Sequence, residues 1–276
     1  MSKFADIYGH EQIKEHLQNA IRLNKVSHAY IFNGPMGSGK KMTAGIFAET
    51  LQCERHGQEP CGTCHSCIQS ESGNQPDIIW VHHEKPGSIG VDDVREQVIG
   101  DMQIKPYSSR YKIYIIDEAE KLTQQAQNAL LKTIEEPPAY GIIILLTTNA
   151  DTFLQTILSR CVRLDFRPLR DTLVTQYLQE KYDLTDYECR FATAFAQGKI
   201  GRAVTIATSK EFAQLKEEVM HVIRYAKEMT TAEIMAEVKN IANYKLTIDD
   251  YLDLMAMWYR DVLVSKSTKD SNALIF

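Results

Sequence analysis

The chain has 276 residues, enough for two domains and part of a third, and a formal net charge of −5 at pH 7. Apolar residues make up 44% and charged residues 24%, the proportions of a globular protein that folds in water. No apolar run approaches the roughly 20 residues of a membrane span, and the N-terminus lacks the apolar core of a secretion signal. The negative charge argues against a free-standing, non-specific DNA-binding protein. We therefore expect a cytoplasmic protein that makes no use of a membrane.

A glycine-rich loop follows a short apolar run near the start of the chain. Residues 29–32 predict a buried β-strand and residues 43–51 predict a helix. The loop between them contains Gly34, Gly37, Gly39 and Lys40. Strand, glycine-rich loop and helix in this order form the loop that cradles nucleotide phosphates. We expect its backbone N–H groups to converge on an anion, and Lys40 to reach the β- and γ-phosphates.

One position of this loop departs from the pattern. The residue after the lysine is normally Ser or Thr, whose hydroxyl holds Mg²⁺, and here it is Lys41. Thr43 is a poor replacement because two further helical residues turn its side chain by about 200°. ATP and Mg²⁺ are thus candidate ligands, but we expect little hydrolysis.

Four of the six cysteines lie close together in the sequence. They are Cys53, Cys61, Cys64 and Cys67. Two overlapping C-x2-C pairs and a fourth cysteine supply a tetrahedral thiolate set, which predicts a structural zinc ion because no coordination position stays open. The alternative is a group of free or redox-active thiols. His65 lies among them, but with four sulfurs present it is not needed as a ligand. One metal site in a reducing compartment fits this spacing better than disulfides do.

The strand predicted over residues 111–116 ends in Asp117 and Glu118. Downstream of a phosphate loop this is the Walker B arrangement, in which the first carboxylate serves Mg²⁺ and the second polarises an attacking water. Alone, such a pair is weak evidence, since acidic residues often begin a helix. Together with the glycine-rich loop it predicts a nucleotide site.

Further strands are predicted over residues 77–81, 141–146 and 162–166, and residues 91–102 predict one amphipathic helix. The uninterrupted apolar run at 141–146 is typical of a central parallel strand buried on both faces. Thr147, Thr148 and Asn149 follow it, at the carboxyl edge where ligands bind to such sheets. They could instead only satisfy backbone groups at the strand end.

The pattern changes after Arg167-Pro-Leu169, which predicts a domain boundary. We expect an α/β domain with a parallel sheet over residues 1–168, carrying the zinc module at about 53–67. Helical patterns then predict a small domain at 169–208 and a third, all-helical domain at 209–276. The apolar ending shortly after a polar tail suggests that this third domain is incomplete.

Taken together, the chain resembles the clamp-loader subunits of the AAA+ ATPase class, and most of all the delta prime family of bacterial DNA polymerase III. The resemblance covers nearly the whole chain. It rests on His28-Ala-Tyr-Ile-Phe before the loop, the four-cysteine insertion, Asp117-Glu118-Ala-Glu, the run from Asn128 to Pro138, and Ser159-Arg160-Cys161.

This resemblance implies a AAA+ fold with a helical lid and a collar-like C-terminal domain. It implies that Arg160 is an arginine finger acting in trans on a neighbouring ATPase subunit, that Thr148 or Asn149 is sensor 1, and that Arg202 is sensor 2. The implied partners are the gamma/tau and delta subunits, the sliding clamp and, through the complex, primed DNA. Structural alternatives are an ion pair of Arg160 with an acid such as Asp165, and a helix cap or ion pair at Arg202.

Two functions follow from different interpretations of the loop. The first is a non-motor clamp-loader subunit, and the second is an active ATPase equivalent to gamma/tau. Lys41 counts against the second, because gamma/tau subunits normally carry Thr or Ser there, and so does the absence of a long C-terminal extension. An unrelated nucleotide kinase would leave Ser159-Arg160-Cys161 unexplained. An incomplete collar would put ring assembly in doubt.

Overall fold

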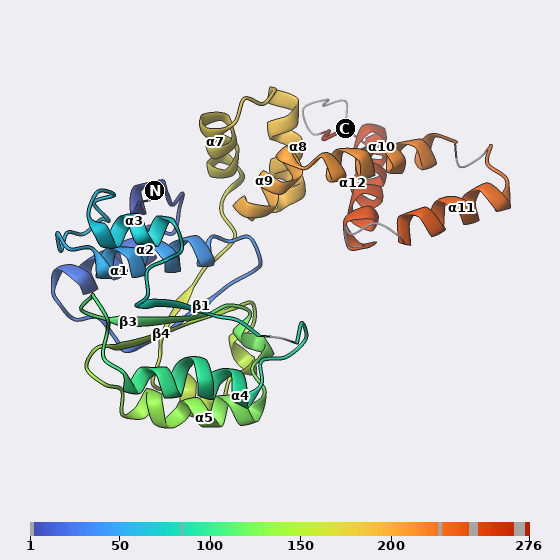
Figure 1. The fold of residues 1–276 in the computed structure, drawn as a ribbon. Coiled ribbons are helices and arrows are strands. Elements are labelled where there is room, and N and C mark those ends of the chain that lie inside the picture. Colours follow the sequence, from blue (N-terminus) through green and yellow to red (C-terminus); the bar gives the residue numbers. More distant parts are fainter. Residues whose placement is uncertain (1–2, 84, 226–227, 243–247, 268–273) are drawn as a thin grey trace. The chain divides into compact units, whose positions relative to one another are not determined.

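Five short apolar stretches form one sheet in the computed structural model, which describes residues 3–83, 85–225, 228–242, 248–267 and 274–276 (Figure 1). The strands are β1 (Ala29–Asn33), β2 (Ile78–Val81), β3 (Lys112–Ile116), β4 (Gly141–Thr147) and β5 (Val162–Asp165). They pair in parallel in the order β2-β3-β4-β1-β5. The strands that the sequence predicts are therefore present and parallel, and β4 lies at the centre of the sheet.

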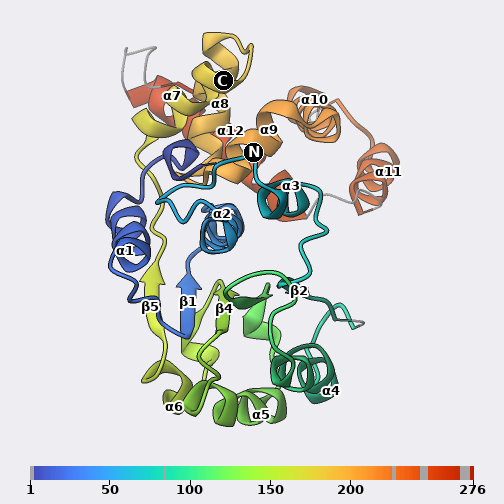
Figure 2. The same cartoon turned by 60° about the vertical axis from the view of Figure 1, so that its left-hand side comes forward.

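Each face of the sheet is covered by helices, as Figure 2 shows. The helices of this part are α1 (Glu11–Arg22), α2 (Lys40–Gln52), α3 (His65–Glu71), α4 (Val91–Val94), α5 (Gln124–Glu135) and α6 (Gln155–Leu158). Alternate residues of a strand point to opposite faces. Accordingly Tyr30 and Phe32 pack with α1 and α2 in one cluster, while Ile31 packs with α4, α5 and α6 in the other. Burial on both faces explains the continuous apolar run of β4.

The single helix predicted over residues 91–102 is not continuous. α4 passes into a π-helical stretch, Arg95–Gly100, and then a short 3-10 helix, Asp101–Gln103. A Cβ at Gly100 would lie 3.1 Å from the Arg95 carbonyl oxygen, so this glycine lets the backbone close tightly there. Val98 and Met102 remain buried, which is why the spacing of apolar residues resembled one regular helix.

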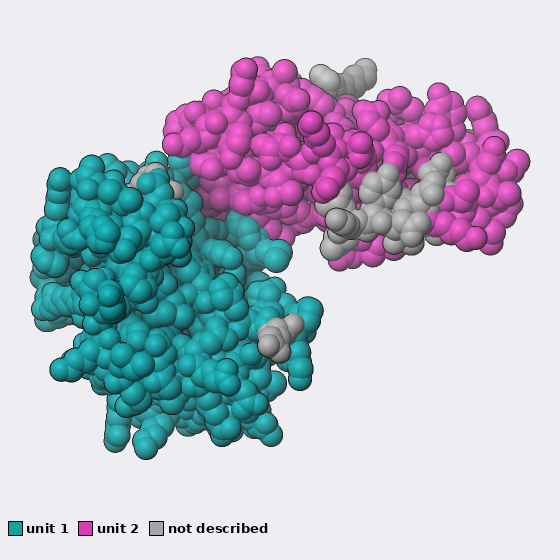
Figure 3. All heavy atoms as spheres, in the orientation of Figure 1, with its two compact units in different colours: residues 1–168 teal, residues 169–276 magenta. Residues whose placement is uncertain are grey.

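The chain divides into two compact units, Met1–Pro168 and Leu169–Phe276, coloured separately in Figure 3. The second unit contains α7 (Asp171–Lys181), α8 (Asp186–Ala196), α9 (Ile200–Thr208), α10 (Lys210–Tyr225), α11 (Thr231–Ala242) and α12 (Ile248–Ser267). One apolar core joins α7, α8, α9, α10 and α12 through residues such as Val174, Phe195 and Leu254. A further boundary after residue 208 stays a prediction, and the described helices on its two sides share this core.

No helix within the described ranges has both the length and the apolar character required to cross a lipid bilayer.

Candidate functional site

The glycine-rich loop turns sharply between the end of β1 and the start of α2. Gly37 and Gly39 have φ angles of 77° and 92°, in the left-handed region that glycine adopts most easily. A Cβ at Gly34 would collide with the Phe166 carbonyl oxygen, so the loop packs directly on the chain that leaves β5. Glycine is therefore needed for conformation at two positions and for space at the third.

Lys40 is folded back on this loop. Its Nζ donates to the carbonyl oxygens of Gly34 at 2.6 Å and Pro35 at 2.9 Å. The side chain is buried, and burial lowers the pKa of the ammonium group. An ammonium group has three donors, so these contacts leave one N–H for a phosphate.

Two further residues of this corner were not selected from the sequence. The ring nitrogen Nε2 of His10 lies 3.1 Å from the Ser38 carbonyl oxygen, and burial lowers the pKa of His10. The Ser38 hydroxyl is buried, and the described residues offer it no hydrogen-bond partner. A buried hydroxyl without a partner fits an anion seated in the loop. His10 begins an ordinary amphipathic helix, and no sequence pattern marked it.

Lys41 occupies the position at which a phosphate loop normally carries the Ser or Thr hydroxyl that binds Mg²⁺. Its Nζ lies 3.2 Å from Oδ2 of Asp117 and 5.2 Å from the centre of the Trp80 ring. Asp117 is thereby neutralised by a cation of the chain itself. Because a magnesium ion requires oxygen ligands in near-octahedral geometry, an ammonium group beside Asp117 disfavours it. The donors of this loop thus fit a phosphate better than they fit Mg²⁺.

The other acids of the Walker B run are also paired. Glu118 contacts Lys121 at 2.7 Å and His83 at 3.6 Å. Glu120, which the sequence analysis did not select as a site residue, accepts hydrogen bonds from the backbone N–H of Thr148 at 3.2 Å and its hydroxyl at 2.8 Å. Burial opposes ionisation of Glu120, but these and neighbouring hydrogen bonds hold its pKa below the usual range.

Asn149 and Thr148 have different hydrogen-bond partners. Its side chain accepts from the backbone N–H of Asp151 and caps the short 3-10 helix Ala150–Thr152. This is the strand-end interpretation that the sequence left open, whereas Thr148 joins the Walker B run through Glu120. Asn33 adds a second strand-end link: it accepts from the N–H of Ala150 and donates to Asp165 at 2.7 Å.

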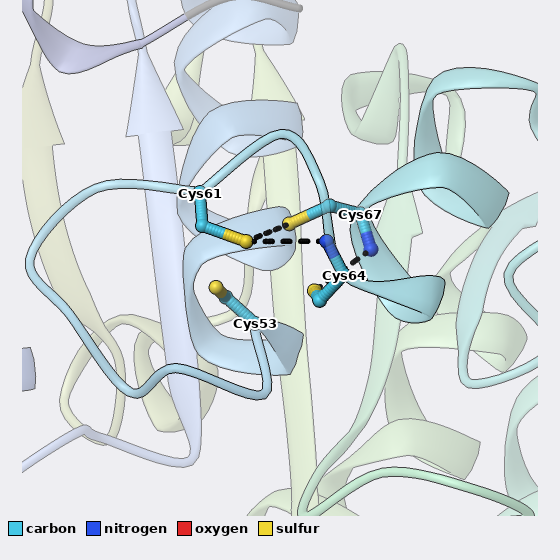
Figure 4. A group of neighbouring side chains, drawn as sticks. All are labelled: Cys53, Cys61, Cys64 and Cys67. Carbon is cyan, nitrogen blue, oxygen red and sulfur yellow. Dashed lines mark hydrogen bonds between the residues drawn. The ribbon is translucent and has the colours of Figure 1, made fainter.

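The four predicted cysteines come together beside α3, as Figure 4 shows. Their Sγ atoms all lie within 4.8 Å of one another, and those of Cys61 and Cys67 are 3.9 Å apart. Tetrahedral zinc with bonds of about 2.3 Å places its sulfur ligands roughly 3.8 Å apart, so the cluster fits such an ion.

The backbone around the cluster favours thiolates. Backbone hydrogen bonds at Thr63 and Cys64 lower the pKa of Cys61 to about 5, against the opposing effect of burial. The N–H of Cys64 lies 3.3 Å from the sulfur of Cys61, and the N–H of Cys67 lies 3.4 Å from the sulfur of Cys64. Burial raises the pKa of Cys67, so a nearby cation is needed for all four sulfurs to ionise together.

Arg160 lies just before β5, at the amino-terminal end of the strands. The phosphate loop follows β1 at their carboxyl end, on the order of 15 Å away along the strand direction. The guanidinium contacts Glu135 at 3.1 Å and the Thr156 carbonyl oxygen at 3.0 Å, and the side chain is 40% exposed. The acid beside Arg160 is thus Glu135, whereas Asp165 pairs with Arg163 at 2.9 Å.

Arg202 belongs to the second unit and has acidic partners there. Its Nη2 lies 2.8 Å from Asp250 and 3.0 Å from Asp253, both on α12. The guanidinium also lies 4.8 Å from the centre of the Phe195 ring. These contacts match the alternative in which Arg202 pairs with an acid, and a role as a sensor stays a prediction.

A parallel five-stranded sheet with a phosphate loop after β1 and acids after β3 defines a P-loop domain of the AAA+ class. The fold is similar to that of a DNA polymerase III gamma subunit-related protein from Thermotoga maritima, with a TM-score of 0.53 and 21% identity. That likeness covers 88% of this chain and 71% of the other, and at this identity it concerns the fold alone.

Sequence comparison identifies a family within the AAA+ class. The family described as "DNA polymerase III, delta subunit" matches residues 9–170. The delta' subunit of DNA polymerase III from Bacillus subtilis is 32% identical over 251 residues, which cover 90% of this chain and 75% of that one. The chain belongs to this clamp-loader family of DNA polymerase III.

The tau/gamma subunit from Haemophilus influenzae is also a relative. It is 38% identical over 210 residues, which cover 74% of this chain. The chain spans only 30% of the length of that relative.

Proposed function

We propose that this chain is a non-motor subunit of the delta prime type, which helps a clamp loader place the sliding clamp on primed DNA. The observation that carries the proposal is the ion pair of Lys41 with Asp117, where a motor subunit would hold Mg²⁺. The expected partners are gamma/tau and delta subunits, and the chain alone should turn over little ATP. None of the six cysteines is in a disulfide, which supports work in the reducing cytoplasm.

The loop would still receive the phosphates of ATP. Backbone N–H groups at the start of α2, the remaining donor of Lys40 and the Ser38 hydroxyl support this. Thr148 would have to release Glu120 before its hydroxyl could donate to a phosphate, whereas Asn149 is already used as a cap. Arg202 would have to release Asp250 and Asp253 before it could bind an anion.

The four cysteines would hold a structural zinc ion. Four thiolates complete a tetrahedral shell, so the ion would bind no substrate and would fix the chain between α2 and β2.

Arg160 would serve the active site of a neighbouring ATPase subunit. It lies at the opposite end of the strands from its own phosphate loop, and its side chain is 40% exposed. Separating a half-exposed ion pair such as the one with Glu135 costs only about 0–1 kcal/mol. A permanently charged, planar guanidinium suits a developing phosphoryl charge, and established arginine fingers contribute about 10³–10⁵ in rate.

The test is a clamp loader reconstituted with Arg160→Ala in this subunit. We expect normal folding and ring assembly but slower clamp- and DNA-stimulated ATP hydrolysis than with the wild-type chain. Arg163→Ala is the matched control, because Arg163 is a similarly exposed, ion-paired arginine three residues away. Wild-type ATPase and clamp-loading rates in the complex with Arg160→Ala would rule out the role in trans.

An active ATPase of the gamma/tau type is the second candidate. It is favoured by the higher identity to the Haemophilus influenzae tau/gamma subunit, 38% against 32% for the Bacillus subtilis delta' subunit. Steady-state ATP hydrolysis by the isolated chain separates the two functions. Robust turnover that Asp117→Asn abolishes would make this chain a motor.

A further inference from the structure

The loop between Cys53 and Cys61 is tied by one side chain to a part of the first unit that is distant in the sequence. Cys53 directly follows α2, and both cysteines belong to the cluster in Figure 4, so the cluster holds the two ends of this loop. Glu59 lies two residues before Cys61 and is partly buried. Its carboxylate accepts hydrogen bonds from the backbone N–H of Phe4 at 2.8 Å and from Nε2 of Gln18 at 3.0 Å.

The two donors that meet Glu59 belong to one structural piece. One lies in the segment before α1 and the other lies on α1 itself. The ammonium group of Lys14 ties this segment to the helix, because it donates to the carbonyl oxygen of Ile7 at 2.9 Å. Apolar residues of the segment and of α1 also share one buried cluster. We call residues 4–22 the N-terminal piece, and Glu59 holds it at two points.

The N-terminal piece also contacts the phosphate loop. His10, the residue before α1, has its Nε2 atom 3.1 Å from the carbonyl oxygen of Ser38. The His10 ring packs against the ring of Phe166, with 4.8 Å between the ring centres. Phe166 is in turn the residue that leaves no room for a Cβ at Gly34. The piece therefore reaches the phosphate loop directly at Ser38 and indirectly at Gly34.

We propose that the cysteine cluster and the phosphate loop are coupled through Glu59. With a metal ion in the cluster, the loop before Cys61 is fixed, and Glu59 keeps the N-terminal piece against the phosphate loop. Without the ion nothing binds the four sulfurs together, so the loop loosens and both hydrogen bonds of Glu59 weaken. The coupling rests on the proposed zinc ion and phosphate site, but it gives Glu59 a role that neither of them requires.

The backbone N–H of Phe4 is a direct reporter, because Glu59 is its hydrogen-bond acceptor. Hydrogen bonds to a charged carboxylate are roughly twice as strong as those between neutral groups. The Phe4 ring is only 1% exposed, so its apolar packing should persist when the hydrogen bond is lost. We therefore expect a local opening at this N–H group and not the unfolding of the whole piece.

The first experiment compares amide hydrogen exchange of the full chain loaded with Zn²⁺ and of the same chain after treatment with a chelator. Exchange at Phe4 should be about tenfold or more faster without zinc, and adding Zn²⁺ should restore the slow rate. The amide of Ile144, buried in β4, should exchange equally in both samples, which checks that the sheet stays folded.

A variant separates the role of Glu59 from the stability of the cluster. Glu59→Ala should speed exchange at Phe4 about as much as zinc removal does, while the four cysteines still bind zinc. Removing zinc from this variant should then add little, because the link is already cut. Gln58→Ala is the matched control, since Gln58 is an exposed neighbour in the same loop. It should behave like the wild type.

The second experiment measures binding of inorganic pyrophosphate to zinc-loaded Glu59→Ala and Gln58→Ala. We expect roughly threefold weaker binding by Glu59→Ala, because His10 and Phe166 then hold the phosphate loop less firmly. A wild-type chain that binds no pyrophosphate would contradict the proposed phosphate site, and exchange at Phe4 would still decide the role of Glu59.

Three results would overturn the coupling. They are equal exchange at Phe4 with and without zinc, an undiminished response to zinc removal in Glu59→Ala, and equal pyrophosphate binding by the two variants. A chain that takes up no zinc would overturn the zinc assignment and the coupling together, and metal analysis recognises this case separately.

Discussion

Two loops of the first unit each bring polar or charged groups together in the way an ion-binding site does. They differ in where the balancing positive charge comes from. In the loop from Cys53 to Cys67 four sulfurs converge within 4.8 Å, and they contact one another and backbone N–H groups. In the loop from Gly34 to Lys41 the cation belongs to the chain, because Lys41 lies 3.2 Å from Asp117.

The difference shows that backbone shape and ion binding are separate properties. Both loops use glycines or tight turns to bring donors together, but the charge balance decides what each can bind. Four thiolates would carry more negative charge than any described neighbour offsets, so we expect all four cysteines to ionise together only around a metal ion. Asp117 already has a cation of the chain beside it, so a second cation there meets repulsion as long as the exposed Lys41 side chain stays in place.

The largest expected effect comes from the cysteine loop. Structural zinc sites contribute roughly 10–16 kcal/mol of apparent binding free energy, so Cys64→Ser should lower the metal content and loosen the chain around Cys53 to Cys67. The sheet should stay folded, because the residues of β1, β3 and β4 are buried against neighbouring strands and the covering helices. Metal analysis and hydrogen exchange measure the two effects.

Cys189→Ser is the control for this change, since Cys189 is buried in the second unit. We expect one zinc per chain in the wild type and in the control. Wild-type protein purified without chelators that contains no metal, with all four thiols of the cluster open to titration, would contradict the zinc assignment.

A smaller effect tests whether the phosphate loop has kept its tight geometry. Gly34→Ala would press a methyl group against Phe166 and should destabilise the first unit by about 1–3 kcal/mol. Gly45→Ala should be neutral or slightly stabilising, because that position is helical and open. Urea unfolding, followed by Trp80 fluorescence in a Trp258→Phe background, compares them. Equal stability of the two variants would show that the loop is not close-packed.

Local patterns were enough to predict the sheet, the glycine-rich loop and the cysteine cluster. Each depends on residues near in sequence, such as the four cysteines or the apolar run of β4. Contacts between distant segments were harder to foresee. Nothing in the spacing pairs Arg160 with Glu135, or Arg202 with Asp250, since both pairs form only after helices pack.

A contact between distant segments was also missed at the phosphate loop. The sequence shows that Lys41 replaces a hydroxyl, but not that its ammonium meets Asp117, because that contact joins α2 to the end of β3. The π-helical stretch was missed for another reason. Its buried residues keep a spacing that a regular helix would also give, and only the backbone around Gly100 distinguishes the two.

The most direct test of the account is the Mg²⁺ dependence of ATP binding by the isolated chain and by Lys41→Thr. We predict that the wild type binds ATP weakly and equally with or without Mg²⁺. Lys41→Thr frees Asp117 and supplies a hydroxyl, so Mg²⁺ should tighten its binding about tenfold, or roughly 1.4 kcal/mol. Lys41→Met, which removes the charge without adding a hydroxyl, should gain less. Tighter Mg²⁺-dependent binding by the wild type, or no response to Mg²⁺ in Lys41→Thr, would contradict the account.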